Sequence, residues 1–196
     1  MVAVEFWFEF ASTYSYPAAV RIGEVARAAG CAVVWRPFLL GPIFKQQGWE
    51  DSPFNLYPAK GRYMWRDLER VCAKADLPFV RPSVFPRNGL RAARVATAAS
   101  DDWIEAFVGR VYRANFAEDR DISDPDVLTS CLEGLVPQPR RTLEEAGDHA
   151  VKQRLRGATE AAIGLGIFGA PTCVVHGELF WGNDRIEAAI EAARSR

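Results

Sequence analysis

The sequence is poor in the residues that usually mark metal or redox chemistry. It has two histidines and four cysteines among 196 residues, and no two cysteines form a C-x-x-C pair. This argues against a zinc knuckle and against a dithiol redox centre. His149 lies in a charged, helix-like stretch, and His176 precedes a glycine in a turn-like pair. We therefore expect no metal site and no Ser-His-Asp triad.

The chain also lacks a dominant charge and a long apolar run. Its net charge is −1, with no basic face that stands out, which argues against nucleic acid or an anionic membrane as a partner. No stretch is long and apolar enough to cross a bilayer. Met1 leads directly into a strand pattern, without a basic segment and a cleavage site. We expect a cytoplasmic protein whose cysteines are buried thiols.

The beginning of the chain predicts a strand, a helix and a second strand. Residues 3–10 are rich in large apolar, β-favouring side chains. Ser12 or Thr13 can cap the helix that follows, and Gly30 is a good signal for its end. Residues 32–38 are again apolar and β-branched, so they predict the second strand.

The middle of the chain predicts helices, and strands return only near its end. Residues 41–56 contain several glycines and prolines and are expected to form a loop. Apolar residues at helical spacing predict helices over residues 62–75, 90–99, 103–116, 125–135 and 143–165. Two short strands, 171–175 and 178–181, and a helix over residues 186–193 complete the predicted elements.

This order of elements, β-α-β, then helices, then β-β-α, predicts an α/β protein with a thioredoxin-like fold and an inserted all-helical domain. The thioredoxin-like domain would comprise residues 1–56 and 166–196, and the helical insertion domain residues 57–165. A chain of 196 residues is long enough to bury the core of one domain with such an insertion.

The segment Ser12-Thr13-Tyr14-Ser15 stands where the first strand gives way to the first helix. The N-terminus of a helix carries partial positive charge and stabilises anions, including a thiolate. A serine at this place can donate a hydrogen bond to a bound thiolate and keep it ionised at neutral pH. The alternative is that Ser12 is only the cap of the helix.

A second segment, Phe168-Gly169-Ala170-Pro171-Thr172, opens the third strand. A cis Ala170-Pro171 bond would expose the backbone of Ala170 sideways, so that a short peptide could pair with it as an added strand. The alternative is a trans proline at the start of an edge strand. These two readings are equally compatible with the segment taken alone.

A third segment, Trp181-Gly182-Asn183-Asp184-Arg185, precedes the last helix. Asp184 can bind an ammonium group, with Gly182 allowing a close approach of the backbone. Alternatively, Asn183 or Asp184 caps the helix. Glutathione has features that match all three segments: a cysteinyl thiol, a peptide backbone, and a γ-glutamyl end with an ammonium and a carboxylate group.

With these segments the chain resembles the 2-hydroxychromene-2-carboxylate isomerases and the related kappa-class glutathione transferases, within the bacterial disulfide-oxidase superfamily. The matching residues are 8–12 with 14–16, then 168–172, and finally 178–185. The likeness runs over nearly the whole chain, including the helical insertion. It departs from the relatives at Thr13, where they commonly have proline, and at Pro17, where they commonly have leucine.

The resemblance implies that glutathione is the cofactor and that Ser12 activates its thiol. It implies that the γ-glutamyl end is held by Trp181, Gly182, Asn183, Asp184 and Arg185. Ala170, with Pro171, would pair with the glutathione backbone. The residues implied for the substrate are Lys45, Asn55, Leu56 and Phe85. A lysine suits a substrate carboxylate, although without the family Lys45 is equally a solvated loop lysine and Phe85 is more simply a core aromatic.

The function implied is that of a glutathione-dependent isomerase in aromatic catabolism. It would open the ring of 2-hydroxychromene-2-carboxylate-type substrates to trans-o-hydroxybenzylidenepyruvate, with no net redox change. Two alternatives remain: a kappa-like glutathione transferase or peroxidase, and a non-catalytic thioredoxin-like binding module. Asp184 and Arg185 argue against the module, because a protein without glutathione has no evident need for them. The resemblance also implies a homodimer.

Overall fold

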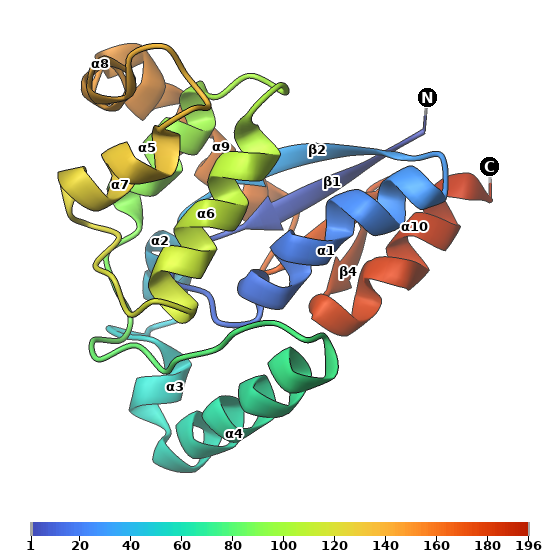
Figure 1. The fold of residues 1–196 in the computed structure, drawn as a ribbon. Coiled ribbons are helices and arrows are strands. Elements are labelled where there is room, and N and C mark those ends of the chain that lie inside the picture. The colour runs from blue at the N-terminus through green and yellow to red at the C-terminus, as the bar shows by residue number, and fades with distance from the viewer. Residues whose placement is uncertain (1, 196) are drawn as a thin grey trace.

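A four-stranded sheet with the order β2-β1-β3-β4 forms the centre of the computed structural model, which describes residues 2–195. Strand β1 (Ala3–Phe8) pairs in parallel with β2 (Ala32–Pro37). On its other side, β1 pairs antiparallel with β3 (Thr172–Val175), which pairs antiparallel with β4 (Glu178–Trp181). The first and last parts of the chain therefore meet in one sheet (Figure 1).

Helices cover both faces of this sheet because the side chains of β1 alternate between the two faces. Val4, Phe6 and Phe8 are buried in the main core together with residues of α1 (Ser15–Ala28) and α10 (Ile186–Arg194). On the other face, Trp7 packs in a smaller cluster with residues of α2 (Leu40–Gln46) and α9 (His149–Gly164). The predicted order of β-α-β and β-β-α, and with it the thioredoxin-like fold, is confirmed.

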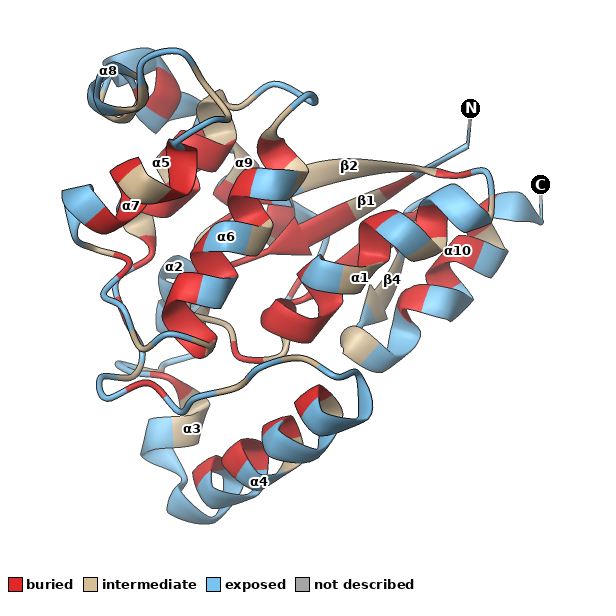
Figure 2. Cartoon of the chain, in the orientation of Figure 1, coloured by how far each residue is buried: buried red, intermediate tan, exposed pale blue. Residues whose placement is uncertain are grey.

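The segment between the two halves of the sheet is helical, as predicted. Its helices are α4 (Pro58–Lys74), α5 (Leu90–Ala98), α6 (Ile104–Phe116), α7 (Pro125–Leu132), α8 (Pro139–Glu145) and α9 (His149–Gly164). Helix α6 packs against α1, and both α5 and α9 contact β2. Figure 2 shows buried residues on both α1 and α6, and these belong to one hydrophobic core. The boundaries predicted at residues 57 and 165 stay a prediction.

Two predictions of secondary structure are wrong. The expected loop over residues 41–56 contains two short helices, α2 (Leu40–Gln46) and α3 (Pro53–Leu56), and Ser52 caps the second by accepting a hydrogen bond from the Phe54 N–H. The helix expected over residues 143–165 is divided into α8 and α9. Asp148 is extended at the start of α9, and this backbone conformation interrupts the helix.

The predicted caps of the first and last helices are also wrong. Helix α1 begins at Ser15, and its N-cap residue makes no side-chain capping bond. Thr13 Oγ1 contacts Met64 Sδ instead, at 3.2 Å. The last helix begins after a short 3₁₀ turn, η1 (Asn183–Arg185), again without a side-chain cap. The polar side chains in front of both helices are therefore engaged elsewhere.

Candidate active site

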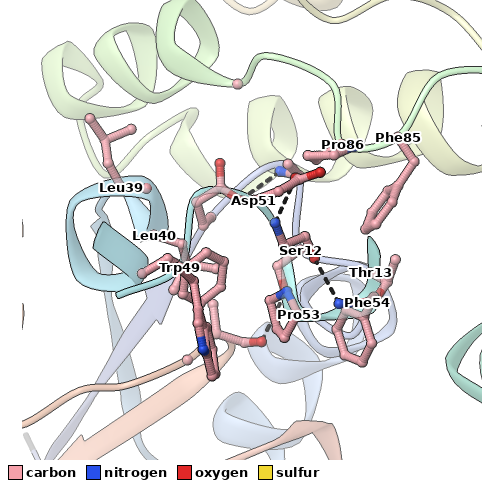
Figure 3. Close-up of a pocket in the computed structure, with 18 of the residues that line it drawn as sticks. Ser12, Thr13, Leu39, Leu40, Trp49, Asp51, Pro53, Phe54, Phe85 and Pro86 are labelled. Atoms are coloured by element: carbon pink, nitrogen blue, oxygen red, sulfur yellow. Dashed lines mark hydrogen bonds between the residues drawn. The ribbon is translucent and has the colours of Figure 1, made fainter. Parts of the chain in front are cut away.

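A cavity of about 720 Å³ opens at the end of β1, where the chain enters α1. Its wall comes from five parts of the chain: residues 9 and 11–14, residues 39–42, 44, 47 and 49–54, Lys60 with Tyr63 on α4, residues 85–90, and residues 168–170 together with Trp181. Most of these side chains are apolar. Figure 3 shows Ser12 and Thr13 from the first part beside Trp49, Phe54 and Phe85 from the others. The cavity thus lies between the thioredoxin-like part and the helical insertion.

A hydrogen bond between Ser12 and Ala170 lies in the wall of the cavity. The Ser12 hydroxyl donates a hydrogen bond of 2.8 Å to the carbonyl oxygen of Ala170, although 158 residues separate the two in sequence. Both residues line the cavity, and the Ala170-Pro171 peptide bond is cis. Ser12 therefore does not cap α1, and its hydroxyl stands where the two halves of the thioredoxin-like part meet.

The start of α1 supplies a favourable environment for an anion beside Ser12. The helix has 14 residues, and its first turn begins three residues after Ser12. Because no side chain caps this end, the partial positive charge of the helix N-terminus is not offset by a capping oxygen. An anion held at Ser12 would lie close to that charge.

Glu9 places a carboxyl group in the floor of the same cavity. Its side chain is 9% exposed, and one carboxyl oxygen accepts a 2.9 Å hydrogen bond from the Ala11 N–H. Burial raises the pKa of Glu9 from its ordinary value of 4.5 to about 7, and the backbone hydrogen bonds only partly oppose this rise. A carboxyl group that changes its charge near neutral pH therefore stands three residues from Ser12.

Helix α6 of the insertion holds the loop that carries Glu9 and Ser12. The Tyr112 hydroxyl donates to the Glu9 carbonyl at 2.8 Å, and the Asn115 side-chain amide donates to the Phe10 carbonyl at 3.1 Å. Arg87 in turn donates to the Asn115 side chain at 3.1 Å. The helical insertion thus supplies the hydrogen bonds that fix this loop.

Arg87 is buried, and its charge is compensated inside the protein. Its guanidinium forms an ion pair with Asp119 and also donates to the Asp119 carbonyl. Hydrogen bonds from the Ser83 backbone and from Arg87 lower the pKa of Asp119. Arg87 lines the cavity, but with Asp119 and Asn115 as partners it acts as a support of the wall.

The structure brings together only part of the predicted site. Ser12, Ala170, Trp181 and Phe85 line the cavity, whereas Pro171 follows directly behind Ala170. The four residues that follow Trp181, Gly182 to Arg185, were also predicted to bind glutathione. They lie outside the lining and form the turn that leads into α10.

The other residues predicted for the substrate lie outside the lining. Lys45, Asn55 and Leu56 are exposed. The Asn55 side chain donates to Asp51 at 3.0 Å and to the Phe85 carbonyl at 3.3 Å, so it supports the cavity wall from behind.

Several lining residues were not found from the sequence. Lys60 is a lysine of the lining, and its ammonium group lies 5.5 Å from the centre of the Tyr57 ring. Phe168, to which the sequence assigned no role, pairs with the predicted Trp181 at a distance of 4.9 Å between ring centres, and both residues are about half exposed. The tight approach of Trp181 to Gly169 leaves no room for a side chain there. For Glu9, the sequence offered one signal: its acidic side chain lies only three positions before Ser12.

Comparison with known proteins identifies the family of this chain. A profile of the DSBA-like thioredoxin domain matches residues 3–193. The chain belongs to the DsbA-like thioredoxin family. A 2-hydroxychromene-2-carboxylate isomerase of Sphingobium xenophagum is 32% identical over 186 residues, which are 94% of this chain and 94% of the relative.

Two further members of the family are similar over most of their length. Glutathione S-transferase kappa 1 of Homo sapiens is 27% identical over 199 residues, covering 94% of this chain and 87% of the relative. A solved structure of a 2-hydroxychromene-2-carboxylate isomerase superposes with a TM-score of 0.84 at 25% identity, covering 97% of this chain and 93% of that chain. The resemblance to this branch of the family is confirmed.

The described residues, 2–195, contain neither a candidate membrane span nor a candidate metal site. Within that range, none of the helices combines the length and the apolar character that a membrane span requires. The same residues contain no group of three or more histidine, cysteine, aspartate or glutamate side chains that could hold a metal ion. All four cysteines are buried and unpaired by disulfides, as predicted.

Proposed function

We propose that this member of the DsbA-like family is a glutathione-dependent isomerase that acts on 2-hydroxychromene-2-carboxylate-type substrates. The observation that carries the proposal is the hydrogen bond from Ser12 to the Ala170 carbonyl at the wall of the cavity. It joins a hydroxyl at a helix start to a backbone segment suited to pairing with a peptide. The similarity to an isomerase and to a glutathione transferase over 94% of the chain supports the same conclusion.

The residues of the cavity fit glutathione. A serine hydroxyl beside an uncapped helix start suits a thiolate. The Ala170 backbone, at the entrance of β3, suits the peptide part. The exposed carboxylate of Asp184 lies in the turn that follows Trp181, where it can meet the γ-glutamyl ammonium group. Bound glutathione would supply a nucleophilic sulfur that adds to the conjugated substrate and leaves again.

In this proposal the protein's own residues bind and orient glutathione and the substrate, and they keep water away from both. Ser12 donates a hydrogen bond that favours the ionised thiol, and the N-terminus of α1 adds its partial positive charge. The apolar walls, including Phe54 and Phe85, exclude water and hold the aromatic part of the substrate. Glu9 holds or releases a proton in the floor of the cavity, because its pKa of about 7 permits both forms.

A cation is needed where the substrate carries its carboxylate. Lys60 lies in the lining and is exposed, so its ammonium group can reach an anion in the cavity. Lys45, which the resemblance implies for this role, lies on α2 outside the lining. The roles of Asn55 and Leu56 in substrate binding, like that of Lys45, stay predictions.

The variant Ser12→Ala tests the proposal. Loss of one charge-assisted hydrogen bond, worth about 1.5–3 kcal/mol, should raise the pKa of bound glutathione by one to two units and lower turnover roughly 10- to 100-fold. The thiolate absorbance of bound glutathione, followed against pH, measures the pKa. Ser15→Ala is the matched control, because it removes a nearby serine hydroxyl that is buried and lies outside the lining. An unchanged thiolate signal in Ser12→Ala would contradict the proposal.

A kappa-like glutathione transferase is the second candidate, and the similarity to the human kappa 1 transferase favours it. The two activities differ in the fate of glutathione. A transferase accumulates a conjugate, whereas the isomerase returns free glutathione after each turnover. Chromatography of the reaction with a chromene carboxylate substrate separates these outcomes. A binding module would show no turnover at all. The homodimer implied by the resemblance remains a prediction, which light scattering measures. The cytoplasmic location expected from the sequence also remains a prediction.

A further inference from the structure

Arg21, on the second turn of α1, reaches across to the turn that precedes α10. Its Nε donates to the Asn183 side-chain oxygen at 3.0 Å, and one terminal nitrogen donates to the Asn183 carbonyl at 2.6 Å. The guanidinium also forms an ion pair with Glu187 in the first turn of α10. The Arg21 side chain therefore binds the backbone and the side chain of Asn183 in η1, and it also binds α10.

This contact is more sheltered than an ordinary surface ion pair. The Arg21 side chain is 26% exposed, whereas Arg27 on the same helix is 64% exposed and pairs only with Glu105. The hydrogen bond and the charge of Arg21 lower the pKa of Glu187. A planar guanidinium satisfies several acceptors at fixed angles, which a lysine cannot do. Arg21 is thus built to hold the position of residue 183.

Besides Arg21, two backbone hydrogen bonds hold this turn: the Gly182 N–H donates to the Pro171 carbonyl at 2.9 Å, and the Arg185 N–H donates to the Gly182 carbonyl at 3.2 Å. Gly182 has a positive φ of 117°, and the turn has no capping side chain of its own. Asp184 makes an ion pair of 3.4 Å with its neighbour Arg185, and both side chains are more than half exposed. Arg21 adds side-chain contacts to both the backbone and the side chain of residue 183, and it therefore contributes to the position of the neighbouring Asp184 carboxylate.

We propose that Arg21 is a positioning residue for the recognition of a γ-glutamyl group by the 182–185 turn. The inference rests on the proposed function, in which this turn binds the amino-acid end of glutathione. Arg21 belongs to the helix whose N-terminus faces the thiol. It therefore sets the distance between the two ends of the bound peptide, and it does so without touching the ligand.

The experiment compares two thiols, glutathione and N-acetyl-cysteinylglycine, which lacks the γ-glutamyl group. Calorimetry gives the Kd of each for the wild type, Arg21→Gln and the control Arg27→Gln. We expect Arg21→Gln to weaken glutathione about tenfold, the equivalent of one charge-assisted hydrogen bond, and to leave N-acetyl-cysteinylglycine unchanged. Arg27→Gln should change neither Kd. Arg21→Lys, which keeps the charge toward Glu187, should lose nearly as much glutathione affinity as Arg21→Gln.

Each other outcome has a distinct meaning. If the wild type binds glutathione tightly and Arg21→Gln binds it equally well, the inference is wrong and the proposed function stands. An equal loss for both thiols would also overturn it, because a general structural defect affects both. If the wild type does not prefer glutathione, the γ-glutamyl site is absent. If it binds neither thiol, the proposed function fails. Should Arg21→Gln not fold, the same comparison with Arg21→Lys decides.

Discussion

The Ser12 hydroxyl has a single proton, and in this structure that proton is directed to the Ala170 carbonyl. To stabilise a thiolate, the hydroxyl must release that carbonyl, because a hydroxyl donates only one hydrogen bond. A peptide that pairs with the Ala170 backbone can replace Ser12 there by offering its own N–H. In the proposed function, recognition of the backbone and activation of the thiol are thus two parts of one exchange.

Glu9 makes stability depend on pH with a defined sign. Its pKa of about 7 in the folded protein exceeds the ordinary 4.5, so the folded state binds the proton more tightly. The stabilisation is fully present below pH 4.5 and is lost as the pH rises through 7, up to roughly 3 kcal/mol. Between pH 4.5 and 8, we expect the free energy of unfolding of the wild type to fall by this amount relative to that of Glu9→Gln. Urea unfolding at each pH measures both free energies.

The control for this measurement is Glu178→Gln, at an exposed position of β4. Its unfolding free energy should follow the wild type across the pH range. Parallel curves for Glu9→Gln and the wild type would show that Glu9 titrates as an ordinary exposed carboxylate, and they would remove it as a proton carrier in the cavity.

At the scale of elements, the question is which helix delivers the cation to the cavity. Lys60 is on α4 and lines the cavity, whereas Lys45 is on α2 and does not. We expect Lys60→Met to raise the KM for a carboxylate substrate about tenfold, the cost of one exposed charge-assisted contact, with Lys45→Met near wild type. Steady-state kinetics measures both. A larger effect of Lys45→Met would instead support the role that the resemblance implies.

Helices with strong local signals were predictable, and helix starts were not. The apolar spacing of residues 103–116 and the β-rich run at residues 3–10 indicated α6 and β1 within a few residues. Ser12 has the right residue type for a cap, but its hydroxyl found a stronger partner 158 residues away. Short helices such as α3, four residues long, fall below the length at which periodicity carries information.

The whole molecule unites the sheet and the helical insertion in one core. Phe8 and Phe10 from the strand end pack with Tyr112 of α6, and Trp65 of α4 belongs to the same cluster. The insertion also fixes the Ser12 loop through Tyr112 and Asn115. Neither part buries its apolar face without the other.

We therefore expect one cooperative thermal transition by circular dichroism. A shortened variant in which residues 57–165 are replaced by a short linker should show no cooperative transition and no glutathione binding, because the exposed core residues lose their cover. Two separate transitions in the full chain, or a shortened variant that melts cooperatively and binds glutathione, would show that the predicted boundaries separate independent domains.

The overall fold was therefore more accessible from sequence than the site. The order of strands and helices depends on local patterns, and these defined the thioredoxin-like part. Glu9, Lys60 and Arg21 acquire their roles from contacts between distant segments, which a single sequence does not display. The three segments around Ser12, Pro171 and Asp184 were recognisable because each places a polar residue or a proline at the boundary of a predicted strand or helix.

The hydrogen bond between Ser12 and Ala170 also has a consequence for how the protein is made. Synthesis proceeds from the N-terminus, so β1, β2 and the insertion leave the ribosome before the strand that pairs with the other side of β1. Until residue 170 emerges, a nascent chain has the serine but not the carbonyl opposite it. The lining of the cavity is completed only once residues 168–181 have been translated, and a product that stops before them lacks the Ala170 side of the site.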